Sequence, residues 1–189
     1  NQDSYAELMT LARQECVRAI GETGLDFNRN YSPHPAQETA FVEQMALAEE
    51  LQLPLFCHQR DAHDHFLALL RQYRQRIPGV VVHCFTDTRE ALIEYLDLDC
   101  YIGITGWICD ERRGLELREL VKLIPADRLL LETDAPYLLP RNLTPKPVSR
   151  INEPAYLPHI LEDVARCQQR SPADLARDCL RNSRAFFSI

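Results

Sequence analysis

The chain has 189 residues, of which 46% are hydrophobic and 26% are charged, and its formal net charge is −7. This is the composition of an ordinary soluble protein, and the length suits one domain, over residues 1–189, with a hydrophobic core. The acidic balance excludes a molecule that attracts nucleic acid over its whole surface, although bound metal ions can still supply positive charge locally.

In chain order, the hydrophobic periodicity predicts alternating helices and strands. These are a helix at 4–16, a strand at 17–21, a helix at 36–51, a strand at 55–58, a helix at 61–73, a strand at 80–84, a helix from Thr88, a strand at 101–105, a helix that ends near Ile124 and a strand at 129–133. Ser4 with Glu7 predicts a capping box, and Asp61 and Thr88 are expected helix caps.

The amino-acid composition changes after the last strand. Half of the 12 prolines lie between residues 135 and 158, which indicates a long ordered loop because apolar and arginine residues interrupt it. Two helices are expected to close the chain, at 158–168 and from Ser171, an expected helix cap that is followed by a proline at the first helical position.

Strand–helix alternation predicts a parallel sheet with covering helices, either an open doubly wound sheet or a (β/α)8 barrel. Polar side chains at the ends of several strands favour the TIM barrel, whose chemistry lies at that face. A complete barrel has eight strands, and this sequence shows five. We therefore expect an incomplete barrel that lacks its front part and has sheet edges at the strands around Ile20 and Leu131.

The chain shows no apolar run of the roughly 18–20 residues that span a bilayer, and no signal segment opens it. The seven cysteines are an odd number without metal-finger spacing, so we expect reduced thiols in a cytoplasmic protein. Cys57 and Cys84 adjoin His58 and His83, and strand alternation is expected to point the thiols to the opposite side.

Four residues of one chemical kind close four of the five apolar runs: Glu22, His58, His83 and Asp134. Each alone is also compatible with a loop carboxylate or a buried imidazole in a satisfied hydrogen bond. Together at one end of a parallel sheet, carboxylates and imidazoles can converge on divalent metal ions. The pattern therefore indicates a metal-dependent hydrolase.

Several segments resemble the TatD family of metal-dependent deoxyribonucleases, in the same order and spacing over nearly the whole chain. Residues 124–134 look like the most specific signature of that family, and the stretches 101–113 and 152–154 are closest to the member for which it is named. The other matching segments are Gly21-Glu22-Thr23-Gly24-Leu25-Asp26, His58-Gln59-Arg60-Asp61-Ala62, His83-Cys84-Phe85-Thr86, Glu132-Thr133-Asp134-Ala135-Pro136-Tyr137 and Asn182-Ser183-Arg184-Ala185-Phe186-Phe187.

The resemblance implies a distorted TIM barrel of the metal-dependent hydrolase type that carries two divalent metals. Glu22 would bridge the metals, His58 and His83 would hold one, and Asp134 would hold the other and orient the attacking water. The family's His-x-His pair from the first strand has no counterpart here. The implied activity is 3′-to-5′ removal of nucleotides from single-stranded DNA, or RNA, in DNA repair. We also expect a monomer.

Phosphodiester hydrolysis by two ions suits Mg²⁺, and the two histidines would also accept Mn²⁺ or Zn²⁺. Arginine binds phosphate in a bidentate manner, and base stacking suits aromatic rings, so a group of loop side chains is expected to contact the substrate. These are Arg60, Arg112, Arg113, Arg141, Arg150, Trp107 and Tyr137, with solvated surface or core packing as the alternative role of each.

Two other hypotheses about the function stay open. The first is an amidohydrolase on the same barrel, which would usually need a carboxylated lysine as the metal bridge. The expected positions of Lys122 on a helix and Lys146 in the proline-rich loop do not suit that role. The second is a truncated barrel that keeps its ligands but has lost turnover.

Overall fold

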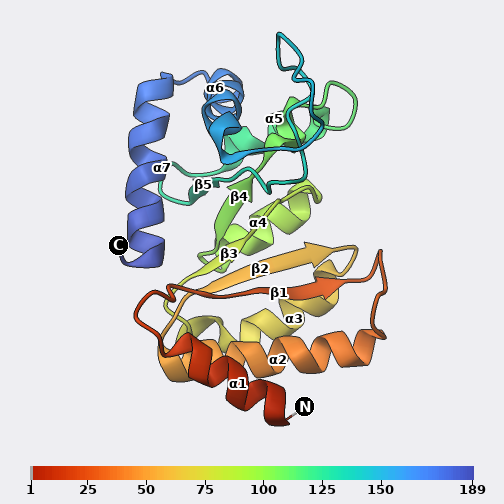
Figure 1. The fold of residues 1–189 in the computed structure, drawn as a ribbon, viewed down its shortest axis with the longest axis vertical. Coiled ribbons are helices and arrows are strands. Elements are labelled where there is room, and N and C mark those ends of the chain that lie inside the picture. Colours follow the sequence, from red (N-terminus) through yellow and green to blue (C-terminus); the bar gives the residue numbers. More distant parts are fainter. Residues whose placement is uncertain (1) are drawn as a thin grey trace.

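The computed structural model describes residues 2–189 and contains one sheet of five parallel strands, in the order β1-β2-β3-β4-β5 (Figure 1). The strands are β1 (Ile20–Asp26), β2 (Leu55–Arg60), β3 (Val80–Val82), β4 (Tyr101–Ile104) and β5 (Leu129–Leu131). The α/β class and the five parallel strands are confirmed, and within the described residues β1 and β5 form the sheet edges, as expected.

Seven α-helices surround this sheet in the described part of the chain, and short 3₁₀ turns connect them at 74–76, 106–109, 121–123 and 154–156. Helices α1, α2 and α3 lie below β1 and β2 in Figure 1, whereas α5, α6 and α7 lie beside β4 and β5. The helices are α1 (Gln2–Ala12), α2 (His34–Leu51), α3 (His63–Tyr73), α4 (Arg89–Asp97), α5 (Leu115–Leu120), α6 (Leu157–Cys167) and α7 (Pro172–Phe187).

The helix starts confirm two of the expected caps. The Thr88 hydroxyl accepts a hydrogen bond from the Ala91 amide at 3.2 Å, and Ser171 accepts one from the Asp174 amide at 3.4 Å. The Asp61 cap is wrong, because α3 has no side-chain cap and Asp61 instead accepts from Asn28. The capping box is also wrong, since α1 begins before Ser4.

Some strands end later than expected and others end earlier. β1 starts three residues later than predicted and continues to Asp26, which pairs with Arg60 at the end of β2. Polar residues extend these strands because ladder hydrogen bonds use the backbone and do not require apolar side chains. Apolar sequence, in contrast, continues beyond the pairing in β3, which ends at Val82.

The core lies between the sheet and its helices and includes several thiols. Cys57, Cys100, Cys109 and Cys179 are buried, Cys16 is exposed, and all seven cysteines are free, as expected. No helix in the described part of the chain is long and apolar enough to cross a membrane. A second, smaller apolar cluster joins Val81 and Leu130 of the sheet to Phe186 of α7.

Candidate metal centre

Three of the predicted site residues meet over the first three strands. The Nε2 atom of His83 lies 2.8 Å from Oε1 of Glu22, and Nδ1 of His58 lies 3.1 Å from the same oxygen. The two imidazole nitrogens are 3.2 Å apart. One carboxylate oxygen and two ring nitrogens thus point at one another from β1, from β2 and from the residue that follows β3.

The glycines beside Glu22 have a structural role. Gly21 and Gly24 adopt φ values of +153° and +144°, which disfavour residues with a side chain. A Cβ atom at either position would clash with the backbone of β2, at Phe56 and His58 respectively. These glycines thus allow β1 to approach β2 closely, and this brings Glu22 beside His58.

A carboxylate lies behind each imidazole, and neither was predicted as a site residue. The Nε2 atom of His58 is 3.3 Å from Oδ2 of Asp26, and Nδ1 of His83 is 3.5 Å from Oε2 of Glu132. Asp26 is the last residue of β1, and Glu132 also accepts a 2.6 Å hydrogen bond from the amide of Cys84. Such carboxylates orient metal-binding histidines and fix their tautomers.

The electrostatics favour a cation at this cluster. Hydrogen bonds from His58 and then from His83 hold the pKa of Glu22 far below its ordinary value. Burial alone would lower the pKa of His83, but hydrogen bonds with Glu132 and Glu22 raise it to about 10. The carboxylates around His83 therefore favour positive charge at the position where the two rings and Glu22 meet.

Asp134 lies beside this cluster without belonging to it. It follows β5 with a left-handed φ of +56° and lines a cavity of about 740 Å³ together with Glu22, His58 and His83. Burial raises the pKa of Asp134, with Glu132 and Glu22 acting in the same direction and His83 opposing them. The structure thus brings all four predicted residues to one cavity, with three in mutual contact.

The position of Cys84 contradicts its expected orientation. The Cys84 side chain lines the same cavity as His83, and its Sγ lies 3.5 Å from the hydroxyl of Thr105. Strand alternation does not apply here, because β3 has ended at Val82 and Cys84 has a φ of +46°. Burial raises the pKa of the Cys84 thiol to about 12, so the thiol is protonated near neutral pH.

The predicted substrate-binding residues fall into three groups. Arg60, Trp107, Tyr137 and Arg150 line the cavity of about 740 Å³ around the three-residue cluster, which we call the metal cavity. Arg113 and Arg141 do not line it, and each pairs with Asp110 at 3.2 Å in an adjoining cavity. Arg112 lines neither cavity.

The comparisons with known proteins agree with this geometry. The family model described as TatD related DNase matches residues 1–188. This chain belongs to the TatD related DNase family. A relative from Klebsiella pneumoniae (strain 342), named 3′-5′ ssDNA/RNA exonuclease TatD, is 60% identical over 182 residues, which cover 96% of this chain and 69% of that protein. A relative of the same name from Citrobacter koseri is 59% identical, with 96% of this chain and 70% of that protein covered.

A solved structure of a TatD homologue from Escherichia coli K12 superimposes with a TM-score of 0.89 at 26% identity, and the match covers all of this chain and 71% of that one. The expected TatD resemblance is therefore confirmed, and the fold is that of the TatD TIM-barrel hydrolases. The described residues contain five parallel strands of this fold.

The cluster of Glu22, His58 and His83 suits a divalent ion, both in the types of its ligand atoms and in their spacing. Two ligands that bind one ion at about 2.1 Å and at right angles lie about 3.0 Å apart. The three separations among Glu22, His58 and His83 range from 2.8 to 3.2 Å. The cluster can therefore hold one divalent ion with little movement of its side chains.

A second group of possible ligands is better explained as a structural network. Cys109, His159 and Asp163 lie within 4.8 Å of one another. Asn142 donates to Asp163 at 2.7 Å and contacts His159 at 2.7 Å, and Arg166 pairs with the other oxygen of Asp163. Burial and Asp163 raise the pKa of the Cys109 thiol, whereas a metal needs the thiolate. This network attaches the proline-rich loop to α6.

Proposed function

We propose that this chain is a metal-dependent nuclease that hydrolyses phosphodiester bonds and removes nucleotides from the 3′ end of single-stranded DNA or RNA. The observation that carries the proposal is the convergence of Glu22, His58 and His83 on one point, inside a cavity that arginine side chains also line. The relatives' name, 3′-5′ ssDNA/RNA exonuclease TatD, supports the polarity and the substrate class.

The proposed cofactors are two divalent ions, with Mg²⁺ favoured and Mn²⁺ or Zn²⁺ as alternatives. When bound, such ions supply an activated water and neutralise charge on the attacked phosphate. Glu22, His58 and His83 would hold one ion, and Glu22 and Asp134 would contribute to the other. Asp26 and Glu132 would keep the ring nitrogens of His58 and His83 aimed at the ion.

The chain's own side chains also position the substrate and the water. The Asp134 carboxylate lines the cavity beside Glu22, where it can orient the attacking water. Arg60 and Arg150 line the same cavity, where their guanidinium groups can hold phosphate oxygens. Trp107 and Tyr137 offer rings on which bases can stack.

The amidohydrolase alternative receives no support from the two lysines. Lys122 pairs with Glu119 at 2.6 Å on a 3₁₀ turn, and Lys146 lies in the proline-rich loop outside the metal cavity. Neither can bridge ions between Glu22 and the histidines. We propose in addition that the protein acts as a cytoplasmic monomer in the turnover or repair of nucleic acids.

The test is hydrolysis of a single-stranded oligonucleotide labelled at its 5′ end, with Mg²⁺ and with EDTA. We expect a ladder of shortened labelled products that EDTA abolishes, and a 5′-to-3′ enzyme would release a labelled mononucleotide instead. His83→Ala should remove the activity because it deletes one ligand of the cluster. His65→Ala is the matched control, since His65 is exposed on α3 and pairs with Glu38.

Full activity of the His83→Ala variant would show that this cluster is not the reaction site. Metal binding by the wild type without cleavage of any phosphodiester would support the alternative of a barrel that has lost turnover.

A further inference from the structure

A second hollow adjoins the metal cavity and is lined largely by other residues. It measures about 650 Å³ and lies between the turn that follows β4 and the proline-rich loop. Trp107, Leu138 and Arg150 line both cavities, so the two adjoin at these residues. We refer to this second hollow as the loop cavity. Its volume is that of a typical ligand site in proteins.

The loop cavity is basic, although the chain as a whole is acidic. Arg113, Arg141, Lys146 and Arg150 line it, against the single carboxylate of Asp110, in a chain with a net charge of −7. Arg113 and Arg141 are held by Asp110. Among the described residues, Lys146 and Arg150 form no ion pair, so both charges are available to an anion.

The aromatic side chain at the junction is fixed in place. The guanidinium of Arg113 lies over the Trp107 ring, 4.4 Å from its centroid. Because Trp107 lines both cavities, a polymer that occupies both lies close to this ring. Basic side chains that follow a backbone, with an aromatic ring between them, are the features by which proteins hold single-stranded nucleic acid without reading its sequence.

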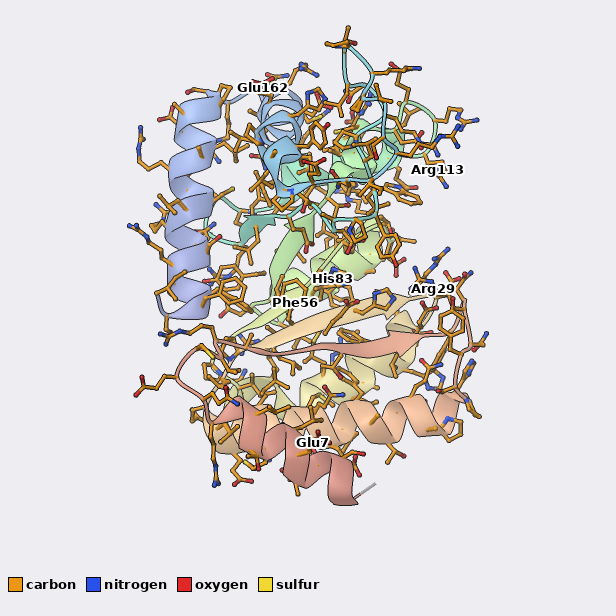
Figure 2. The ribbon with its side chains drawn as sticks, viewed as in Figure 1. Glu7, Arg29, Phe56, His83, Arg113 and Glu162 are labelled. Carbon is orange, nitrogen blue, oxygen red and sulfur yellow. The ribbon has the colours of Figure 1, made fainter. Side chains whose placement is uncertain are left out.

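A smaller hollow meets the metal cavity at Glu22, Arg29 and His58. It measures about 300 Å³, and the loop between β1 and α2 closes it with Arg29 and Tyr31. Figure 2 shows Arg29 on the part of the molecule that carries β1, whereas Arg113 lies well above both Arg29 and His83, on the part built around the turn after β4. A single released nucleotide suits the small hollow, and a continuing strand needs the larger and more basic one.

We propose that the loop cavity binds the part of the nucleic acid strand on the 5′ side of the cleaved bond, with backbone phosphates on Lys146 and Arg150 and a base at Trp107. This inference rests on the proposed nuclease function for its polarity. It assigns a binding role to Lys146 and sets the direction in which the strand leaves the metal ions.

The first test is equilibrium binding of a fluorescent oligothymidine of about ten nucleotides, measured by anisotropy in EDTA so that no strand is cut. The chain contains two lysines, which gives a matched pair of variants, Lys146→Gln and Lys122→Gln. Lys146 is exposed in a loop, so its replacement leaves the core intact. We expect Lys146→Gln to lower the slope of log affinity against log salt by about 0.7 and to weaken binding about eightfold at about 50 mM salt.

Lys122→Gln should match the wild type. Equal behaviour of the two variants, or a wild type that does not bind the strand, would overturn the proposal. Hydrolysis by the wild type is scored separately. If the wild type cleaves the strand and the two lysine variants bind it equally well, the binding role of the loop cavity is rejected and the nuclease function stands. If binding depends on salt through Lys146 but no cleavage occurs, the binding role stands and the nuclease function is rejected.

The second test addresses the direction of the strand. A dinucleotide has no phosphate on the 5′ side of its cleaved bond, whereas a ten-nucleotide strand fills that side. The ratio of the dinucleotide KM to the decanucleotide KM should therefore be large in the wild type and about eightfold smaller in Lys146→Gln. An unchanged ratio would place the 5′ part of the strand elsewhere.

Discussion

Asp26 provides the sharpest test of how the metal centre is held. Its Oδ2 lies 3.3 Å from Nε2 of His58, on the side of the ring opposite to the atom that faces Glu22. Two unit charges at this separation interact by about 5 kcal/mol at an effective dielectric constant of about 20. That value is an upper bound, because a metal-bound imidazole carries only part of the charge of the ion. We therefore expect Asp26→Asn to weaken metal binding about 10- to 100-fold, or about 1.4–2.7 kcal/mol.

The assay is calorimetric titration of the metal-free protein with Mn²⁺, together with thermal unfolding in EDTA. Asp26 also pairs with Arg29 at 3.4 Å and accepts from the Arg29 amide at 2.7 Å, so an effect through the loop must be separated from an effect on His58. Arg29→Ala breaks the ion pair without touching His58 and is the control. An Asp26→Asn affinity within twofold of the wild type, or an equal loss in both variants, would refute the positioning role.

Three further outcomes are expected. Asp134→Asn should lower kcat by about 10²- to 10⁴-fold while one metal equivalent is retained after dialysis, because Asp134 lies outside the three-residue cluster; loss of all metal would contradict this. Thr88→Ala should cost about 1 kcal/mol and lower Tm by about 2–4 °C, because the cap of α4 is lost, and the exposed Thr144→Ala should show no change. The pKa of Asp110 is lowered to about 2, first by the Arg112 amide, so the stability that its carboxylate contributes is present above pH 3.8 and is lost as pH falls through about 2. The Tm difference between the wild type and Asp110→Asn should therefore shrink over that pH window, and a constant difference would contradict the assignment.

The sequence was sufficient for the class of fold because apolar runs alternate with amphipathic segments. It was less reliable at the strand ends, where pairing is decided between backbones. Asp26 pairs with Arg60 although neither side chain signals a buried strand, and Cys84 leaves the strand although its neighbours are apolar. Glu22 accordingly lies inside β1 and not at its end.

The candidate ligands were predictable because their residue types are uncommon next to buried strands. The supporting carboxylates were not, since their role depends on distances of 3.3 and 3.5 Å to particular ring nitrogens. Both Asp26 and Glu132 lie in segments that matched the family, which is the signal that could have identified them. The pairing of Arg113 and Arg141 through Asp110 depends likewise on how the proline-rich loop folds back.

The distribution of thiols has a practical consequence for spectroscopy. Of the seven cysteines only Cys16, just after α1, is exposed, and burial raises the pKa of the half-buried Cys84 and Cys167 thiols. A thiolate-directed maleimide dye should therefore attach selectively to Cys16 in the native protein. The unmodified chain thus carries its own single labelling position, outside the residues that line the metal cavity, and distances from a labelled DNA strand can be measured without engineering the protein.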